Sequence, residues 1–245
     1  MHTVFRFLRQ LLLTVLLLAL LVLVAAGGYF AVTGHKLYES AIQVTPIDTL
    51  YSSISSREGF VPYAQLPQTY INAVISAEDS RFTHHKGVDP VSIARALVTD
   101  LRTGSFAEGG STITQQLAKN LYFSQEKTMS RKAAEVFLAL EIEQKYTKDE
   151  ILELYVNSIY FGDGYYSVGE ASEGYFGKPA SEMNDYECTL LAGVPNAPSK
   201  YAPSKNLALA EKRQQKVISR MEACGYIKNQ KITSVVDRKK SVSVK

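Results

Sequence analysis

The sequence predicts a mainly α-helical domain that follows a single membrane-spanning helix. Residues 11–32 carry no charge and are mostly Leu, Val and Ala, and apolar residues recur at helical spacing through much of the remaining chain. No run alternates convincingly between apolar and polar residues, as a half-buried strand would. Of the 245 residues, 46% are hydrophobic, which is enough for one sizeable core. The formal net charge of +3 gives no domain-wide basic field, so nucleic acid is not an expected partner.

The uncharged run is long enough to cross a bilayer as a helix. At ~1.5 Å per residue it reaches about 33 Å, against a hydrocarbon layer of ~30 Å. Arg6 and Arg9 precede it, and positive residues tend to remain cytoplasmic. The sequence therefore predicts a cytoplasmic segment at 1–10, a transmembrane anchor at 11–33 and an extracytoplasmic remainder. A cleaved signal peptide is the alternative, because "VAAGG" resembles a cleavage site, but the apolar run continues past these alanines.

The rest of the chain divides into a linker, a folded domain and a tail. Residues 34–54 are predicted to be a linker of extended or irregular chain, since this polar, serine-rich composition continues to residue 66. The folded domain is assigned to 55–228, with a mobile loop expected at 105–110. The Lys- and Ser-rich tail, 229–245, is predicted to be flexible.

Apolar spacing and capping residues predict the helices of the domain. Ser111 and Ser130 are expected to begin two of them, and Thr147 with Glu150 forms a capping-box pattern before a third. Glycines interrupt the regular pattern at 160–178. Helices are predicted at 67–78, 95–104, 112–121, 131–146, 151–157, 184–194 and 208–226.

The two cysteines, Cys188 and Cys224, are too few for a disulfide scaffold. They are able to form one bridge. The favoured interpretation of Cys188, within "YECTLLAGV", is a small buried apolar residue.

Two glutamates continue the apolar faces of predicted helices. Glu78 follows Ile71, Val74 and Ile75, so its carboxylate is expected to be partly removed from water and to accept a proton well near neutral pH. An ordinary acid at a helix end is the alternative, and the many ionisable residues of "EDSRFTHHKG" favour a site. No second cluster matches the adjacent histidines, so a metal site is not expected. Glu135 also shares a face with apolar residues. The alternative is that it is an ordinary acid in a first helical turn, where a negative charge interacts favourably with the helix dipole.

The polar stretch "EGGSTITQQLAKN", residues 108–120, is predicted to bind an anion. Glycines before a helix N-terminus leave backbone N–H groups free, and neutral donors with nearby cations suit a phosphate or diphosphate. The Gly-Lys-Ser/Thr run of a nucleotide P-loop is absent. A polar helix start with solvated lysines is the alternative. The candidate donors and cations are Ser111, Thr112, Gln115, Lys119, Lys127, Arg131, Lys132, Arg81 and Arg95.

At these residues the sequence resembles the peptidoglycan glycosyltransferases, glycosyltransferase family 51, which occur as monofunctional enzymes and as a domain of class A penicillin-binding proteins. The resemblance covers roughly residues 55–227 and five motifs in order. The first motif is Glu78, Asp79, Phe82, His85 and Gly87; the second is "GGSTITQQ" with Lys119 and Asn120; the third is Arg131, Lys132 and Glu135. The fourth is Lys148, Ile151, Leu152, Tyr155 and Asn157, and the weaker fifth is Arg213, Val217 and Ile218.

The resemblance implies a lysozyme-like helical fold with a small membrane-proximal lobe. It implies that Glu78 is the general base on the 4-hydroxyl of lipid II, which attacks the lipid-linked glycan with inversion and releases undecaprenyl diphosphate. Glu135 would be a second acid, the donors and cations above would hold the diphosphate and sugar, and Asp79, Phe82, His85, Gly87, Tyr155 and Asn157 would be motif residues with structural roles.

The resemblance also sets expectations about partners and cofactors. The expected partners are lipid II and lipid-linked glycan, the bacterial membrane and proteins of cell-wall synthesis or division. No cofactor is required, although Mg²⁺ or Mn²⁺ can assist the diphosphate. Lysine at position 127, where the family often has arginine, loses a bidentate fork. Transpeptidase activity is not expected, and the alternatives are a lytic, sugar-cleaving enzyme or a non-catalytic anchored scaffold.

Overall fold

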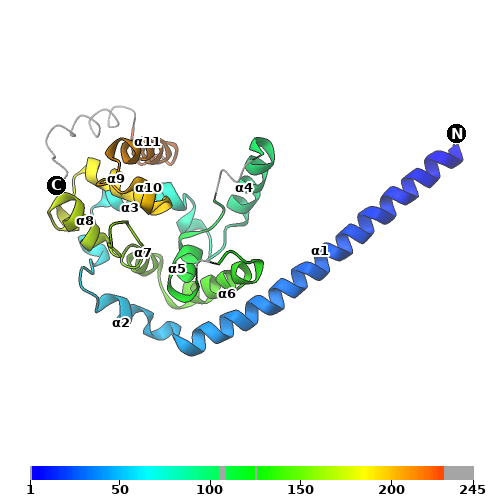
Figure 1. The fold of residues 1–245 in the computed structure, drawn as a ribbon, viewed down its shortest axis with the longest axis horizontal. Helices are drawn as coiled ribbons and strands as arrows, with labels where there is room; N and C mark the ends of the chain where they lie inside the picture. Colours follow the sequence, from blue (N-terminus) through cyan, green and yellow to red (C-terminus); the bar gives the residue numbers. More distant parts are fainter. Residues whose placement is uncertain (1, 105–108, 125, 229–245) are drawn as a thin grey trace.

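The computed structural model in Figure 1 describes residues 2–104, 109–124 and 126–228. Within these ranges the regular structure is helical and contains no β-strand, as the sequence predicts. The expected mobile loop lies largely outside the described residues, and the expected tail lies wholly outside them. The α-helices are α1 (His2–Val44), α2 (Leu50–Ser55), α3 (Gln68–Glu78), α4 (Pro90–Thr103), α5 (Ile113–Tyr122), α6 (Met129–Lys145), α7 (Lys148–Val156), α8 (Val168–Phe176), α9 (Asp185–Gly193), α10 (Pro198–Tyr201) and α11 (Leu207–Ala223). Short 3₁₀ helices are η1 (Ile47–Thr49), η2 (Tyr63–Gln65), η3 (Phe82–His84), η4 (Ala180–Glu182) and η5 (Val194–Asn196).

Helix α1 is long and apolar, and it runs away from the other helices in Figure 1. By length and composition it is able to cross a membrane. The expectation of irregular chain from residue 34 is wrong, because α1 continues without a break to Val44. The reason is a second pattern within the polar stretch: Gly34, Tyr38 and Ile42 recur at a spacing of four, and Tyr38 and Ile42 pack against the core. This part of α1 lies against α6.

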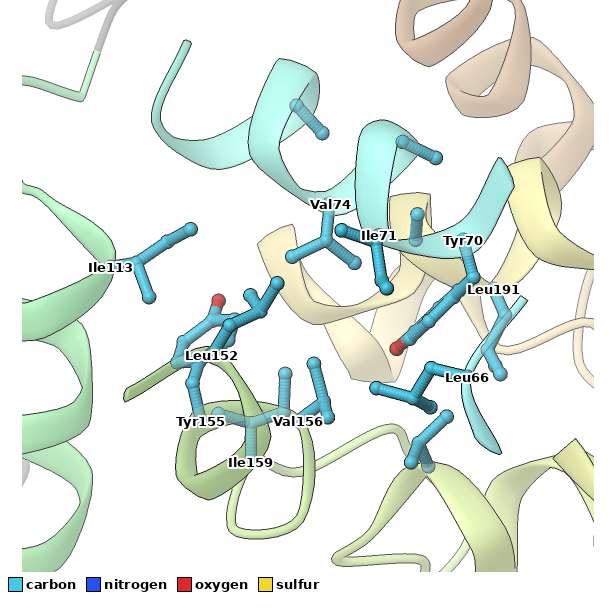
Figure 2. Packing of buried hydrophobic residues seen from close by; sticks show 14 of the residues in the cluster. Leu66, Tyr70, Ile71, Val74, Ile113, Leu152, Tyr155, Val156, Ile159 and Leu191 are labelled. Atoms are coloured by element: carbon cyan, nitrogen blue, oxygen red, sulfur yellow. The ribbon is translucent and has the colours of Figure 1, made fainter. Parts of the chain in front are cut away.

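The core joins α3 to α7 and α9. Figure 2 shows Ile71 and Val74 of α3 pointing toward Leu152 and Val156 of α7, with side chains of α9 behind them. These side chains belong to one continuous cluster of buried residues, which also includes Ile113 at the start of α5. Burial on this scale favours folding by about 25 cal/mol for each Å² of apolar surface removed from water. The core therefore holds the end of α3, where Glu78 lies, against the beginning of α5.

Two helices begin one or two residues away from the predicted position. Thr112, rather than Ser111, caps α5, and its hydroxyl accepts a hydrogen bond from the backbone N–H of Gln115 at 3.1 Å. Thr128, rather than Ser130, caps α6 in the same way. The predicted capping box at Thr147 is confirmed. Because Thr112 is the cap, the hydroxyl of Ser111 takes no part in capping. It lies instead at the wall of the cleft that is described in the next section.

The glycine-rich segment at 160–178 is only partly irregular. Helix α8 forms within it, capped by Ser167, and ends at Gly177 in the left-handed conformation. Cys188 is buried, and both cysteines are free thiols. The interpretation of Cys188 as a small core residue is therefore confirmed.

Candidate active site

The candidate site is a cleft bounded by the end of α3, the start of α5, η5, α10 and α11. Two adjoining cavities of about 220 and 370 Å³ share Glu78, Gly109, Ser111 and Arg220 in their walls. The smaller cavity continues over the start of α4, where Ser92 and Arg95 line it. The larger one continues between α5 and α11, and its further lining includes Gln116, Lys119, Asn196, Arg213 and Lys216.

Glu78 is the last residue of α3, and its side chain is 10% exposed. Its Oε2 accepts a hydrogen bond of 3.0 Å from Nε2 of Gln116. Its Oε1 is buried and has no hydrogen bond, and Nη2 of Arg213 lies 3.6 Å away. One oxygen of the carboxylate is thus held by a neutral amide, and the other lies buried beside a cation without a hydrogen bond. The predicted semi-buried position of Glu78 is confirmed.

Gln116 is held in turn by Tyr155. The buried hydroxyl of Tyr155 donates to Oε1 of Gln116 at 3.1 Å, so the amide must present its N–H group to Glu78. Burial, reinforced by the negative charge of Glu78, raises the pKa of Tyr155 well above its ordinary value, so its hydroxyl remains a donor. Tyr155 lies in the core, as its predicted structural role requires, and it also orients the polar groups of the cleft.

The glutamine predicted to contact a ligand is the neighbouring residue, Gln115. The side chain of Gln115 is used inside α5, where Oε1 accepts from the backbone N–H of Thr112 at 3.1 Å and closes a capping box. Thr112 itself is buried and donates to the carbonyl oxygen of Gly87 at 2.6 Å. Both polar side chains therefore have internal partners, and the expected ligand contact moves from Gln115 to Gln116.

The other residues of the first motif build the support behind Glu78. Asp79 accepts hydrogen bonds from the backbone N–H of Ile113 at 3.1 Å and, through the same oxygen, faces Nε2 of His85 at 2.9 Å. An anion at this position also favours the N-terminal end of α5. Gly87 has φ +83, and a Cβ there would lie 2.8 Å from the carbonyl oxygen of Ala139, so only glycine fits. These residues fix α5 and α6 relative to α3.

A cluster of charged side chains on α6 lies behind Ser111, which lines both cavities, while Arg131, Lys132 and Glu135 themselves line neither. Nζ of Lys132 donates to Oγ of Ser111 at 2.6 Å and to Oε2 of Glu135 at 2.8 Å. Nε of Arg131 lies 3.0 Å from the other oxygen of Glu135, close enough for an ion pair. Glu135 is 1% exposed, so the two cations balance a carboxylate that would otherwise be buried alone.

Lys119 extends this cluster toward Glu78 along the wall of the larger cavity. Burial is the main cause that lowers the pKa of Lys119 below 10.5; Glu135 and Glu78 oppose the shift, while Lys132 and Arg131 add to it. Lys119, Arg131 and Lys132 with the single carboxylate of Glu135 leave an excess of positive charge. This part of the cleft is therefore suited to an anion.

The remaining predicted residues lie apart from this cluster. Arg95 is exposed on α4 and lines the smaller cavity, whereas Lys127 is exposed before α6 and lines neither cavity. Nε of Arg81 lies 3.0 Å from the carboxylate of Asp89, the residue that caps α4. Phe82 and Asn157 are buried: Nζ of Lys148 lies 4.4 Å from the Phe82 ring centroid, and Asn157 bonds both backbone groups of Val61.

Helix α11 contributes two cations that were not predicted, Lys216 and Arg220, beside Arg213, which was predicted only as a residue of the fifth motif. Arg213, Lys216 and Arg220 follow one another at spacings of three and four, so they share one face of the helix, and this face lines the cleft. Nη1 of Arg220 donates to the carbonyl oxygen of Ala77 at 3.3 Å. The helical spacing of these three cations was readable in the sequence, but their proximity to Glu78 depends on the packing of α11 against α3.

Fold and site together define a helical enzyme domain with one long apolar helix, in which a semi-buried carboxylate lies in a cleft beside several cations. A family model described as "Transglycosylase" matches residues 45–222, and the chain belongs to the transglycosylase family. The predicted resemblance to glycosyltransferases of this family is therefore confirmed.

Three relatives show the extent of the similarity. The chain is 43% identical to penicillin-binding protein 1A of Aquifex aeolicus over 190 residues, which cover 77% of this chain and 26% of that protein. It is 49% identical to penicillin-binding protein 1A of Escherichia coli over 166 residues, 68% of this chain and 20% of that protein. It is 38% identical to penicillin-binding protein 1A/1B of Bacillus subtilis over an alignment of 249 positions, which covers 97% of this chain and 27% of that protein. The chain thus spans about a quarter or less of the length of these relatives.

Proposed function

We propose that the chain polymerises the glycan strands of peptidoglycan. It would transfer the growing glycan from its lipid diphosphate to the 4-hydroxyl of lipid II, with inversion, and release undecaprenyl diphosphate. The observation that carries this proposal is that the carboxylate of Glu78 and the ammonium of Lys119 line the same cavity. A base beside an anion site matches an alcohol acceptor and a diphosphate leaving group.

The first step uses Glu78 as the general base. Oε1 would accept the proton of the acceptor hydroxyl while its oxygen forms a bond to the anomeric carbon of the donor sugar. Gln116 holds Oε2, so rotation of the carboxylate away from the acceptor is restrained. Nη2 of Arg213, 3.6 Å from Oε1, would help to hold the carboxylate in place.

The second half of the reaction is the departure of the diphosphate. As the bond between the anomeric carbon and the phosphate oxygen breaks, negative charge gathers on that oxygen. Lys119 and Lys132 would stabilise this charge, and a fixed set of cations is effective because it needs no rearrangement during the reaction. Glu135 would assist by holding Lys132 and Arg131 in place, and it would not itself remove a proton. A Mg²⁺ or Mn²⁺ ion would assist through the diphosphate oxygens, and we propose no required cofactor.

The membrane topology is part of the proposal. Arg6 and Arg9 precede the apolar part of α1 and would remain cytoplasmic, so the cleft would face the outer side of the membrane. Helix α4 stands apart from the other helices in Figure 1, on the side of the apolar half of α1. It exposes apolar side chains that suit a small membrane-proximal lobe: Val91, Ile93, Leu97, Val98 and Leu101. Proteins of cell-wall synthesis or division remain predicted partners.

The test is the incubation of the purified full chain with lipid II in vesicles. Formation of glycan chains and undecaprenyl diphosphate would support the proposal. Cleavage of finished glycan without any product from lipid II would instead support a lytic enzyme. A chain that converts neither substrate would support an anchored scaffold. Product chains are separated by length on a gel, with a reaction lacking protein as the control.

A further inference from the structure

Gly34 lies in a close contact between α1 and the start of α6. A Cβ on Gly34 would lie 2.5 Å from Cβ of Ala133, 2.8 Å from the carbonyl oxygen of Ser130 and 3.0 Å from the backbone nitrogen of Ala134. Any side chain would therefore push the two helices apart. Glycine is unfavourable inside a helix compared with alanine, so its presence here needs a packing reason, and this contact provides one.

Specific side-chain interactions extend the contact on both sides of Gly34. The hydroxyls of Thr33 and Ser130 share a hydrogen bond of 2.8 Å. The ring of His35 meets the ring of Phe137 edge to face, with centroids 5.2 Å apart, and one turn further the hydroxyl of Tyr38 donates to Glu141. We call this surface the α1–α6 contact; it comprises Thr33, Gly34, His35 and Tyr38 with Ser130, Ala133, Phe137 and Glu141.

The two faces of α6 have different partners. Ser130, Ala133, Phe137 and Glu141 recur at spacings of three and four and face α1. Lys132 and Glu135 lie on the other side, where Lys132 reaches Ser111 in the wall of the cleft. The residues that Gly34 approaches are therefore the chain neighbours of the cations, and a displacement of this first part of α6 would move them.

We propose that α1 positions the cation cluster of the cleft, with Gly34 as the positioning residue. This inference rests on the proposed function, since it assigns the cluster to a lipid-linked diphosphate. Helix α1 is unbroken from its apolar part to the α1–α6 contact. The contact would thus hold Lys132 beside Ser111 and Arg131 beside Glu135. It would also keep both cations at a constant height above the bilayer, where the diphosphate of a membrane lipid lies.

The experiment compares Gly34→Leu with Gly28→Leu in the full chain in vesicles. Gly28 lies on the same helix, and a Cβ there would meet nothing within 4 Å, so it is a matched control. We expect Gly34→Leu to reduce kcat/KM for lipid II by about 10- to 100-fold, since small displacements of positioning groups have effects of this size. The loss should appear as a raised KM and a raised Kd for undecaprenyl diphosphate, while Gly28→Leu remains within about twofold of wild type.

Three outcomes overturn the inference. The first is an unchanged Kd for undecaprenyl diphosphate in Gly34→Leu. The second is an equal loss of kcat/KM in Gly28→Leu. The third is a fall in kcat at constant KM and Kd, which would indicate that a smaller fraction of the protein is folded. The Kd measurement needs no turnover, so it separates the two proposals. If wild type binds undecaprenyl diphosphate but polymerises no lipid II, the proposed polymerase function fails while the effect of Gly34→Leu on Kd still decides the positioning role.

A crosslink tests the contact itself. In a chain with Cys188 and Cys224 replaced by alanine, Thr33→Cys with Ser130→Cys should form a disulfide under mild oxidation in vesicles, because the native hydroxyls lie 2.8 Å apart. Gly28→Cys with Ser130→Cys should remain reduced. Absence of the first crosslink, or equal formation of both, would show that α1 does not pack on α6 as proposed.

Discussion

The end of α3 and the first turns of α6 each present a buried glutamate near the cleft, but their surroundings differ. Glu78 has one oxygen on the neutral amide of Gln116 and one oxygen without a hydrogen bond. Glu135 has a cation beside each oxygen, Lys132 at 2.8 Å and Arg131 at 3.0 Å. Each carboxylate keeps one oxygen without a hydrogen bond, but the donor to the other oxygen is a neutral amide for Glu78 and an ammonium for Glu135. The cations also lie closer to Glu135, since Arg213 is 3.6 Å from Glu78.

The difference shows how neighbours assign roles to identical side chains. A carboxylate held by neutral donors can still accept a proton. A carboxylate whose oxygens both face cations at close range serves to balance the charge of those cations. Glu135 instead keeps the two cations at fixed positions.

The largest expected effect comes from Glu78→Gln. An amide cannot act as a general base, so we expect the rate of lipid II polymerisation to fall by about 10²–10⁴. Stability should change little, because Gln116 can still donate to the amide oxygen. A loss of less than about 1 kcal/mol corresponds to a Tm shift of about 2–4 °C in a domain of this size. The measurements are initial rates of glycan formation and thermal unfolding.

The control for this variant is Glu182→Gln, which makes the same change at an exposed position in η4. Its rate should equal that of wild type. A Glu78→Gln enzyme with more than about a tenth of wild-type activity would contradict the assignment of the base.

Glu135→Gln should produce the opposite pattern. It removes the charge that holds Arg131 and Lys132, and hydrogen bonds to charged groups contribute about 1.5–3 kcal/mol. Because Lys132 is 40% exposed and water can replace part of this interaction, we expect a stability loss of about 1–2 kcal/mol. The KM for lipid II should rise by about tenfold. If kcat instead fell by about 10²–10⁴ with unchanged KM and Tm, Glu135 would itself transfer a proton.

The titration of Lys119 allows its contribution to anion binding to be measured separately from the contribution of Glu78. Since burial lowers the pKa of Lys119, its ammonium loses a proton below pH 10.5, and the affinity for undecaprenyl diphosphate should fall as pH rises through that lowered pKa. In the same window the unfolded chain binds more protons than the folded chain, so stability should rise with pH. Lys119→Arg should retain affinity at alkaline pH, because arginine remains charged.

Calorimetric Kd values from about pH 7 to about pH 10 would measure this effect. Lys119→Ala should weaken binding at every pH by about tenfold or more, while the protein stays folded. An equal alkaline loss in wild type and Lys119→Arg would assign the titration to another group.

The semi-buried position of Glu78 could be predicted from the sequence because it depends on local pattern. Glu78 continues the apolar stripe of α3, and a residue at the end of such a stripe lies at the border between core and cleft. The choice between Gln115 and Gln116 was also encoded locally. Thr112 and Gln115 have the spacing of a capping box, which predicts that Gln115 turns back into the helix and Gln116 faces outward. The predicted cap, Ser111, lies one residue before the observed cap, Thr112, and this shift by one residue separates Gln115 from Gln116.

Other parts of the site could not be predicted because they depend on packing between distant segments. Arg213 reaches Glu78 only because α11 packs on α3. The helical course of residues 34–44 follows from contact with α6, and the polar composition of this stretch conceals its single buried face. Tertiary contacts of this kind override local composition.

The smallest expected effect comes from Tyr155→Phe, which tests how Glu78 is held. The variant keeps the buried ring and removes the hydroxyl that donates to Gln116 at 3.1 Å. Without that donor the amide of Gln116 can turn over and present its oxygen to Glu78, where two acceptors repel each other. A neutral hydrogen bond contributes about 0.5–1.5 kcal/mol, so kcat should fall by about 2- to 10-fold. Gln116→Glu should lower kcat further, since it places a second negative charge beside the base. If Tyr155→Phe left kcat unchanged while Gln116→Glu reduced it, Gln116 would hold Glu78 without help from Tyr155.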